Sequence, residues 1–259
     1  MLPTSLAAAW GLRTRPGKGP KPGLTLDRIV AAGVRVAATD GLGAVSMSRV
    51  ANELGAATMS LYRYVTAKGE LLDLMVDMAL GTPPAPHPGE GWRAGLHRFA
   101  HMYLALLREQ PWIIRVPITT PPLTPNQVAW MDHGLSTMRD TGLPQSERLS
   151  TIMTVSGLVR NWALLTADIT AAAQSVGGTT GEAMVSYGEL LARLVDPQRF
   201  PAVGELIASG ILGLPPEVPD EDFEFGLARL LDGIDALIRR RGDTPSCDES
   251  ALPRSTATR

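Results

Sequence analysis

The amino-acid sequence predicts an all-α protein with a small amino-terminal unit and a larger carboxy-terminal unit. Apolar residues recur three or four positions apart in one segment after another, which is the period of a helix with one buried face. Glycine and proline separate these segments, and no run alternates apolar and polar residues for long enough to form a strand. With 259 residues and 44% hydrophobic content, the chain can bury a sizeable core.

The amino-terminal unit, residues 24–80, is predicted to hold four short helices, of which the first three form a helix-turn-helix domain. Their expected limits are Thr25 to Asp40, Ser46 to Leu54, Thr58 to Val65, and a start near Thr66 or Ala67 for the fourth. Thr25 and Ser46 are suitable N-caps, and Gly41 and Gly55 end the first two helices. Residues 1–23 lack apolar periodicity and are expected to form a flexible basic arm.

The clearest break in the chain is residues 81–89, where four prolines in six residues cannot continue a helix. We therefore place a domain boundary here and assign residues 90–241 to the second unit. Its helices are expected at Trp92 to Pro111, Asn126 to Thr141, Gln145 to Ala173, Glu182 to Val195, Ala202 to Gly210 and Phe223 to Arg241, with at most a short helix between Ile113 and Pro125. Residues 242–259 have almost no large apolar residues and are expected to be disordered.

Positive charge is concentrated at the amino-terminal end. Residues 1–81 hold nine Lys/Arg against six Asp/Glu, whereas the rest of the chain brings the total to a net charge of −2. A basic end on a mildly acidic body is typical of a specific nucleic-acid binder with modest non-specific affinity. The single cysteine, Cys247, permits no internal disulfide, and neither a membrane-spanning run nor a signal peptide is recognisable. We expect a soluble cytoplasmic protein without membrane contact.

The segment Thr58-Met59-Ser60-Leu61-Tyr62-Arg63-Tyr64-Val65 makes DNA binding the first hypothesis. One side is small, polar and aromatic, and the other is apolar through Leu61 and Val65. Such a helix can be held by a compact core while it presents a short surface to base edges and phosphates. A tight turn at residues 54–57 precedes it, and Lys68 follows it.

These features together resemble the amino-terminal DNA-binding domain of the TetR family. The resemblance covers residues 24–80 and rests on Leu61-Tyr62-Arg63-Tyr64-Val65, Lys68, Leu71-Leu72, Gly41-Leu42, the helix start from Ser46 to Ala51, and Leu54-Gly55. Beyond residue 81, Trp92 opening a helix and Gln110-Pro111-Trp112 closing it look like the branch closest to the tetracycline repressor. The resemblance implies a cytoplasmic homodimeric regulator, usually a repressor, that a small ligand releases from a palindromic operator.

Seven residues are predicted to contact DNA. The hydroxyl of Ser48 and its helix amino terminus can donate to phosphate. Thr58 and Ser60 can hydrogen-bond to base edges, and Met59 can contact a thymine methyl group. By the family motif, the remaining three match phosphate- and sugar-contacting positions: Tyr62, Tyr64 and Lys68. For Tyr62, packing against the first helix remains the alternative.

Direct base reading is expected to be limited, because the third helix contains no Asn or Gln. Basic residues of the amino-terminal arm can compensate by reaching the minor groove: Arg13, Arg15, Lys18 and Lys21. A solvated tail without DNA contact is the alternative interpretation of this arm.

A ligand-released regulator requires an apolar cavity with a few polar anchors in its carboxy-terminal unit. By residue type and expected inward face, the candidates are His101, Tyr103, Trp130, His133, Asn161 and Trp162. Each of them can equally be an ordinary core residue. A DNA-binding or partner-binding helical protein without an effector is the alternative function, and it would have a filled carboxy-terminal core.

The sequence gives no basis for a cofactor, a metal ion or an enzyme. His97 and His101 stand four positions apart on one helix, but Arg98 replaces the glutamate of a zinc-protease motif and no third ligand is identifiable. No Gly-x-Ser-x-Gly motif and no phosphate-binding loop are present.

Homodimerisation is expected to join the helices near residues 145–173 and 223–241 into a four-helix interface. Small residues along them would allow close approach: Ser156, Gly157, Ala163, Gly226, Ala228 and Gly233. Packing of these residues within one chain is the alternative.

Overall fold

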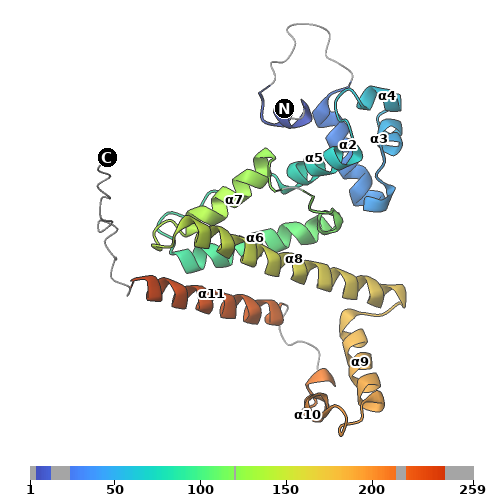
Figure 1. Cartoon of the computed structure of the whole chain (residues 1–259). Helices are drawn as coiled ribbons and strands as arrows, with labels where there is room; N and C mark the ends of the chain where they lie inside the picture. Colours follow the sequence, from blue (N-terminus) through green and yellow to red (C-terminus); the bar gives the residue numbers. More distant parts are fainter. Residues whose placement is uncertain (1–3, 13–23, 120, 214–219, 243–259) are drawn as a thin grey trace, which may run out of the picture.

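The structure, a computed structural model, describes residues 4–12, 24–119, 121–213 and 220–242. Every regular element within these ranges is helical, as the sequence predicts. Two units are visible in Figure 1: a small head with α1 to α5 and a larger body with α6 to α11. None of the described helices is long and apolar enough to cross a membrane.

The four predicted helices of the head all form, in the predicted order. They are α2 (Leu26–Asp40), α3 (Met47–Glu53), α4 (Thr58–Leu61) and α5 (Lys68–Leu80), with a 3₁₀ turn, η1 (Leu42–Ala44), after α2. The hydroxyl oxygens of Thr25 and Ser46 accept from the backbone N–H groups three residues later, so both predicted N-caps are confirmed. Gly55 has φ +62°, which a residue with a side chain rarely adopts, and it permits the turn between α3 and α4.

The head core fixes α5 against α2 at short range. Ile29, Leu61 and Met75 are fully buried in it. A Cβ atom added at Gly33 would lie 2.6 Å from the sulfur of Met75, so the absence of a side chain at Gly33 lets Met75 pack directly on the backbone of α2. Because Leu61 anchors α4 in this core, the opposite side of α4 faces away from the core.

The third helix is shorter than predicted. Instead of reaching Val65, α4 ends at Leu61, whose carbonyl accepts from the N–H groups of both Tyr64 (2.8 Å) and Val65 (3.0 Å). These bonds tighten the chain into a turn, because the burial of Leu61 and Val65 requires the backbone to bend back to the core.

The expectation of a flexible arm over residues 1–23 is wrong for its first part. Thr4–Ala9 form a short helix, α1. The hydroxyl of Ser5 bonds Glu70 of α5, and the indole N–H of Trp10 donates to the carbonyl of Leu123 at 2.8 Å. Tertiary contacts with the head and with the body therefore order a segment that has no helical periodicity of its own. Residues 13–23, and the predicted disordered tail from residue 243 on, lie outside the described residues.

The body contains six α-helices and two 3₁₀ turns among its described residues. They are α6 (Trp92–Glu109), η2 (Pro111–Arg115), α7 (Pro125–Thr137), α8 (Gln145–Ser175), α9 (Thr180–Leu194), α10 (Pro201–Ala208), η3 (Ile211–Gly213) and α11 (Glu221–Gly242). α7 ends four residues before the predicted Thr141, because its last turn tightens into i to i+3 bonds at Met138 and Arg139. The linker between head and body, residues 81–89, is not helical, as predicted.

α6 is the central helix of the body and packs against α7 and α8. α11 runs alongside them, whereas α9 and α10 project from the far end of α8 (Figure 1). The buried residues of the head and of the body form one continuous hydrophobic cluster.

A buried carboxylate connects the head to the body. Asp77 of α5 is 8% exposed, and its Oδ1 accepts from the backbone N–H groups of Asn126 (2.7 Å) and Gln127 (3.2 Å). The first turn of α7 has donors without intrahelical partners and a positive dipole end, so an anion is favourable there. Helix α5 of the head thus caps helix α7 of the body.

Candidate functional site

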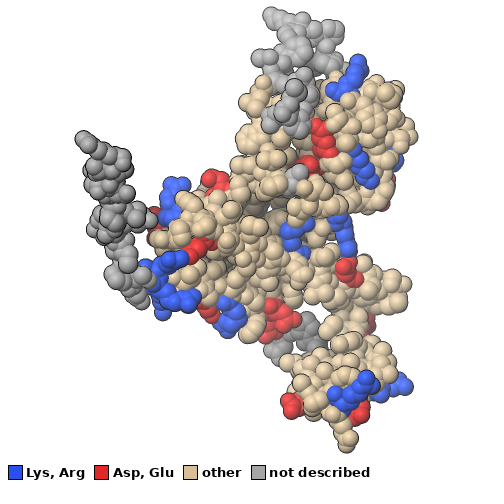
Figure 2. Space-filling model, viewed as in Figure 1, with Lys and Arg blue, Asp and Glu red and all other residues tan. Residues whose placement is uncertain are grey.

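The head exposes a continuous polar and aromatic surface around α4, which we call the α3–α4 surface. It consists of Ser48, Thr58, Met59, Ser60, Tyr62 and Lys68, and all of these residues are at least partly exposed. Met59 is 74% exposed although its side chain is apolar, and Tyr62 is 42% exposed. Figure 2 shows basic side chains on the head beside this surface. An exposed methionine flanked by hydroxyl groups is suited to contact with a partner.

Two side chains fix the helix that carries Lys68. Lys68 is the first residue of α5, and Glu70 accepts from the backbone N–H of Thr66 at 2.6 Å and from its hydroxyl at 2.8 Å. This bond closes the first turn of α5 in the manner of a cap. The ammonium group of Lys68 therefore extends from a well-defined helix start.

Arg49 holds α3 in place rather than contributing a cation to the surface. Its guanidinium donates to Glu53 at 2.9 Å and to Asp40, at the end of α2, at 3.0 Å. The hydrogen bond from Arg49 lowers the pKa of the Glu53 carboxyl. The ion pairs thus fix the angle between α2 and α3.

Tyr64 occupies a different environment from the one predicted for it. Its hydroxyl donates to the carbonyl of Leu24 at 2.9 Å, and the ring packs against the head core. The hydroxyl proton of Tyr64, which a phosphate contact would require, is therefore already donated within the head. Tyr64 connects the turn after α4 to the residue that precedes Thr25, and Tyr62 is the tyrosine that faces outward. The predicted arm contacts, Arg13, Arg15, Lys18 and Lys21, lie outside the described residues.

Three of the six predicted effector residues converge on Phe99 in the body. The ring of Phe99 stacks on His133 at 6.1 Å between centroids and lies 5.9 Å from Trp130 and 6.3 Å from Tyr103. Tyr103 and Trp130 are 5.8 Å apart. We call these four residues the Phe99 cluster. It joins α6 to α7, and Phe99, Trp130 and His133 are buried.

The Phe99 cluster is connected directly to the end of α5. The indole N–H of Trp130 donates to the carbonyls of Gly81 (3.0 Å) and Leu80 (3.3 Å). A displacement of Trp130 would therefore act on the last turn of the head.

His133 is the polar group of the cluster. It is 4% exposed, and its Nε2 has no hydrogen-bond partner among the described residues. Burial lowers the pKa of its imidazole, and the charge of Arg98 lowers it further. The ring is therefore neutral at physiological pH, with one nitrogen available for a hydrogen bond.

The other three predicted effector residues lie elsewhere. His101 and Trp162 both contact Phe223 of α11, at 5.4 and 6.2 Å between ring centroids. Asn161 is exposed on α8, so its assignment to an inward face is wrong. The long helix rotates this position outward because Val155, Val159 and Ala163 occupy its buried face.

Two surface clefts are separate from the Phe99 cluster. An open groove of about 590 Å³ lies between α6 and α11, and its walls include Trp92, His97 and Glu224. A second cleft of about 360 Å³ lies between the head and the body, where Leu42 faces Pro111 and Trp112.

Comparison with known proteins assigns both units. The family description "Bacterial regulatory proteins, tetR family" matches residues 29–75, and "Tetracyclin repressor-like, C-terminal domain" matches residues 85–238, more than half of the chain. The chain belongs to the TetR family. It is thus a transcriptional regulator rather than an enzyme, and TetR-family regulators bind DNA and small-molecule effectors.

Individual relatives in the TetR family support the assignment. The HTH-type transcriptional repressor DrrR1 of Streptomyces coeruleorubidus is 39% identical over 246 residues, which are 93% of this chain and 88% of the relative. An HTH-type transcriptional regulator of Saccharopolyspora erythraea is 31% identical over 54% of this chain and 59% of its own length. The solved structure of ActR from Streptomyces coelicolor with actinorhodin is 27% identical, with a TM-score of 0.68 over 85% of this chain and 99% of ActR.

Two residues that matter in this TetR-family structure were not predicted to be functional. Asp77 had no distinguishing sequence signal, because Glu70 and Asp73 precede it at helical spacing and make it look like the end of an acidic stripe. Phe99 lies in the helix predicted at Trp92 to Pro111 and had no individual assignment. Helical spacing shows that such a ring is buried but not which rings from another helix surround it.

Proposed function

We propose that this TetR-family regulator is a repressor that binds a palindromic operator as a homodimer and leaves it when a small, largely apolar molecule binds the body. The observation that carries the proposal is the link from Trp130 to Gly81, because it joins the Phe99 cluster to the end of helix α5. The repressor name of DrrR1 supports the direction of regulation.

The α3–α4 surface is the operator contact in this proposal. α4 enters the major groove, where Thr58, Met59 and Ser60 meet base edges and Met59 contacts a thymine methyl group. Ser48, Tyr62 and Lys68 contact phosphates on either side. Specificity comes in addition from the spacing of two half-sites, about 34–36 Å for one helical turn.

The Phe99 cluster is the effector site in this proposal. Three aromatic rings favour a flat apolar molecule, and the neutral Nε2 of His133 can hydrogen-bond to a polar group on it. Because Phe99, Trp130 and His133 are buried in this structure, the ligand-bound arrangement must differ at these side chains. ActR supports a ligand response, since its solved structures include complexes with actinorhodin and (S)-DNPA.

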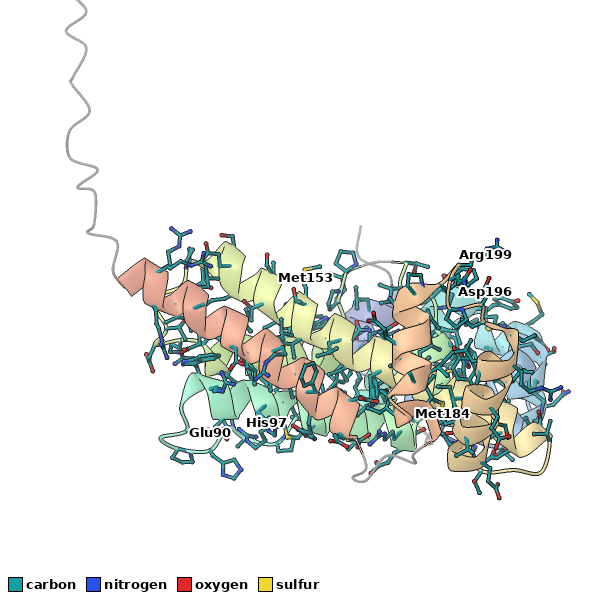
Figure 3. The ribbon with its side chains drawn as sticks, turned by 90° about the horizontal axis from the view of Figure 1, so that it is seen from below. Glu90, His97, Met153, Met184, Asp196 and Arg199 are labelled. Carbon is teal, nitrogen blue, oxygen red and sulfur yellow. The ribbon has the colours of Figure 1, made fainter. Side chains whose placement is uncertain are left out.

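The dimer forms through α8 and α11 in this proposal. Leu149 and Met153 are exposed one turn apart on α8, Leu165 is exposed further along the same helix, and Phe225 is exposed on α11. Figure 3 shows α8 and α11 side by side, with Met153 on the outer side of α8. An added Cβ at Gly157 or Gly233 meets nothing within 4 Å, so these positions leave room for a second copy. Ala163 is an exception, because it is buried within the chain.

The proposal is tested by measuring operator binding of the full chain to DNA selected from a random pool. Lys68→Ala is expected to weaken binding to every sequence and to reduce the slope of log K against log salt by about 0.9, the value for one phosphate that is no longer neutralised. Arg199→Ala on the projecting α10 side of the body removes the same charge and is the matched control; it should change neither quantity. Equal effects of both variants would contradict the α3–α4 surface as the contact.

The effector is tested on the same complex with actinorhodin, the ligand of ActR, as the first probe. We expect Trp130→Phe, which keeps an aromatic ring but removes the bonds to Leu80 and Gly81, to bind the operator normally and to need a different ligand concentration for release. Release of the variant at the wild-type concentration would contradict the Trp130 link. A wild-type complex that no apolar aromatic compound dissociates would favour a constitutive DNA-binding protein.

A further inference from the structure

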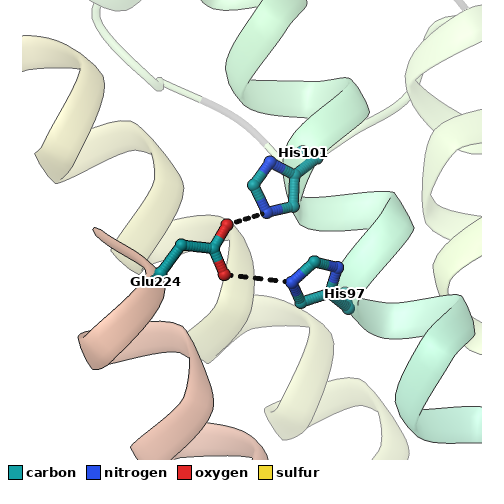
Figure 4. Close-up of side chains that lie close together, drawn as sticks. All are labelled: His97, His101 and Glu224. Carbon is teal, nitrogen blue, oxygen red and sulfur yellow. Dashed lines mark hydrogen bonds and ion pairs between the residues drawn. The ribbon is translucent and has the colours of Figure 1, made fainter. Parts of the chain in front are cut away.

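Two imidazoles and one carboxylate meet between α6 and α11, away from the α3–α4 surface and the Phe99 cluster (Figure 4). The Nε2 of His97 lies 3.0 Å from Oε2 of Glu224, and the Nε2 of His101 lies 2.6 Å from Oε1 of the same carboxylate. The donor atoms of the three side chains all lie within 4.8 Å of one another. We propose that His97, His101 and Glu224 form a binding site for a divalent transition-metal ion, with Zn²⁺ as the best fit.

The geometry of the three ligands suits one ion. Zn–N and Zn–O bonds of about 2.0–2.2 Å place two ligand atoms of one ion at most about 4.4 Å apart, so small side-chain rotations bring the cluster to this spacing. His97 and His101 lie one turn apart on α6, and the rings of His101 and Phe223 meet edge to face, 5.4 Å apart between centroids. Two His ligands and one carboxylate, with further positions open, are an established donor set for first-row metals.

The bonding of His101 is incomplete without an ion. Its Nε2 is buried and has no hydrogen-bond partner among the described residues, although it lies 2.6 Å from Oε1 of Glu224. A metal ion that binds both atoms, once small side-chain rotations have moved them apart, would satisfy both. Because His97 and Glu224 also line the open groove of about 590 Å³, water can complete the coordination.

The surrounding charges are compatible with a cation. Ion pairs flank the cluster on both sides along α6: Arg93 pairs with Asp232 of α11, and Arg108 pairs with Asp220, which directly precedes α11. Arg108 thus pairs with Asp220, and Arg93 shares Asp232 with Arg229. Glu224 remains as the negative ligand for the ion, next to two further acidic residues in the first turn of α11. A bound ion would fix the first turns of α11 on the middle of α6.

The test is a titration of the EDTA-treated full chain with Zn²⁺ at pH 7.5, because the ligands bind a metal in their deprotonated form. We expect one ion per chain by calorimetry, tetrahedral absorption bands with Co²⁺, and an unfolding midpoint raised by about 5–10 °C at a hundredfold excess over Kd. Absence of stoichiometric binding by the wild-type chain would overturn the proposal.

Single-ligand variants distinguish this site from a simple histidine pair on one helix. Removal of a group that only hydrogen-bonds to a metal ligand already costs about 10–100-fold in affinity, so Glu224→Gln and His97→Gln should each cost at least about 100-fold. The matched controls are Asp222→Asn, on the same turn of α11, and His87→Gln in the linker; both should bind like the wild type. The metal-free unfolding midpoint of each variant reports its folding. Wild-type affinity in Glu224→Gln would show that α11 contributes no ligand, and the proposal would then be wrong.

Discussion

Tyr62 and Tyr64 show how two neighbouring residues of one type can have opposite roles. Both match DNA-contacting positions of the TetR family, yet Tyr64 donates its phenolic proton to Leu24, whereas Tyr62 is 42% exposed. Sequence alone cannot separate them, because the difference arises from the turn that begins at Leu61. The shared chemistry of the two rings makes them a matched pair for experiment.

We expect Tyr64→Phe to reduce the free energy of unfolding by about 0.5–1.5 kcal/mol, since it removes one partly buried hydrogen bond. Its affinity for the operator should stay close to that of the wild type. Tyr62→Phe should do the reverse, with unchanged unfolding in urea and weaker operator binding. Operator binding weakened as much in Tyr64→Phe as in Tyr62→Phe would restore Tyr64 as a phosphate-binding residue.

His133 links pH to stability. Burial lowers the pKa of its imidazole from the ordinary value of 6.5, so as pH falls through about 6.5 the unfolded chain takes up a proton that the folded chain does not. This contribution to stability is complete above pH 6.5 and is lost progressively below it, down to the lowered pKa of the folded state. We expect thermal unfolding of His133→Phe to lack this part of the pH dependence and that of His87→Gln, a change in the exposed linker, to retain it. An unchanged pH profile in His133→Phe would contradict the assignment.

At the scale of elements, the sequence predicts where helices start, but it does not predict which distant segments they contact. The N-caps at Thr25 and Ser46 are local signals, and α2 and α3 begin where these residues require. α1 is ordered instead by contacts of Ser5 and Trp10 with residues 65 and 113 positions away. Glu224 is 127 positions from His97, so helical spacing had no means of pairing them.

The cap that α5 provides for α7 can be tested within one helix. Asp77→Asn should lower the free energy of unfolding by about 1–3 kcal/mol, because it weakens charge-assisted bonds to the N–H groups of Asn126 and Gln127. Asp73→Asn, one turn earlier, is the control: burial raises the pKa of Asp73, and the nearby charge of Glu70 raises it further, so neutralising it should not destabilise the chain. Urea denaturation measures both, and equal destabilisation would contradict a specific role for the cap.

At the scale of the whole molecule, the fold class and the two units follow from the sequence, whereas the composition of each site does not. Helical period and the prolines of residues 81–89 are properties of consecutive residues. The way in which α6 and α7 cross decides which residues join the Phe99 cluster. It brings Tyr103, Trp130 and His133 together and leaves His101 against Phe223 of α11. Residue type identified plausible ligands for an effector, but only packing shows which of them meet.

The proposed dimer interface on α8 is also a property of the whole molecule. We expect Met153→Glu to convert the chain from a dimer to a monomer in light scattering, because a charge buried between two copies of α8 lacks a partner. Met78→Glu, at an exposed apolar position of the head, should stay dimeric. If Met153→Glu keeps twice the chain mass, the outer side of α8 is not the interface.

The cap of α7 by Asp77 also limits which heads and bodies of related regulators can be joined in one chain. Asp77 lies within residues 24–80, but Asn126 and Trp130, which bond the end of α5, belong to the body. A chimera that joins the head of one relative to the body of another therefore inherits half of this junction from each parent. We expect such exchanges to keep both operator recognition and ligand release only where the two halves match, so that heads and bodies are interchangeable in compatible sets rather than freely.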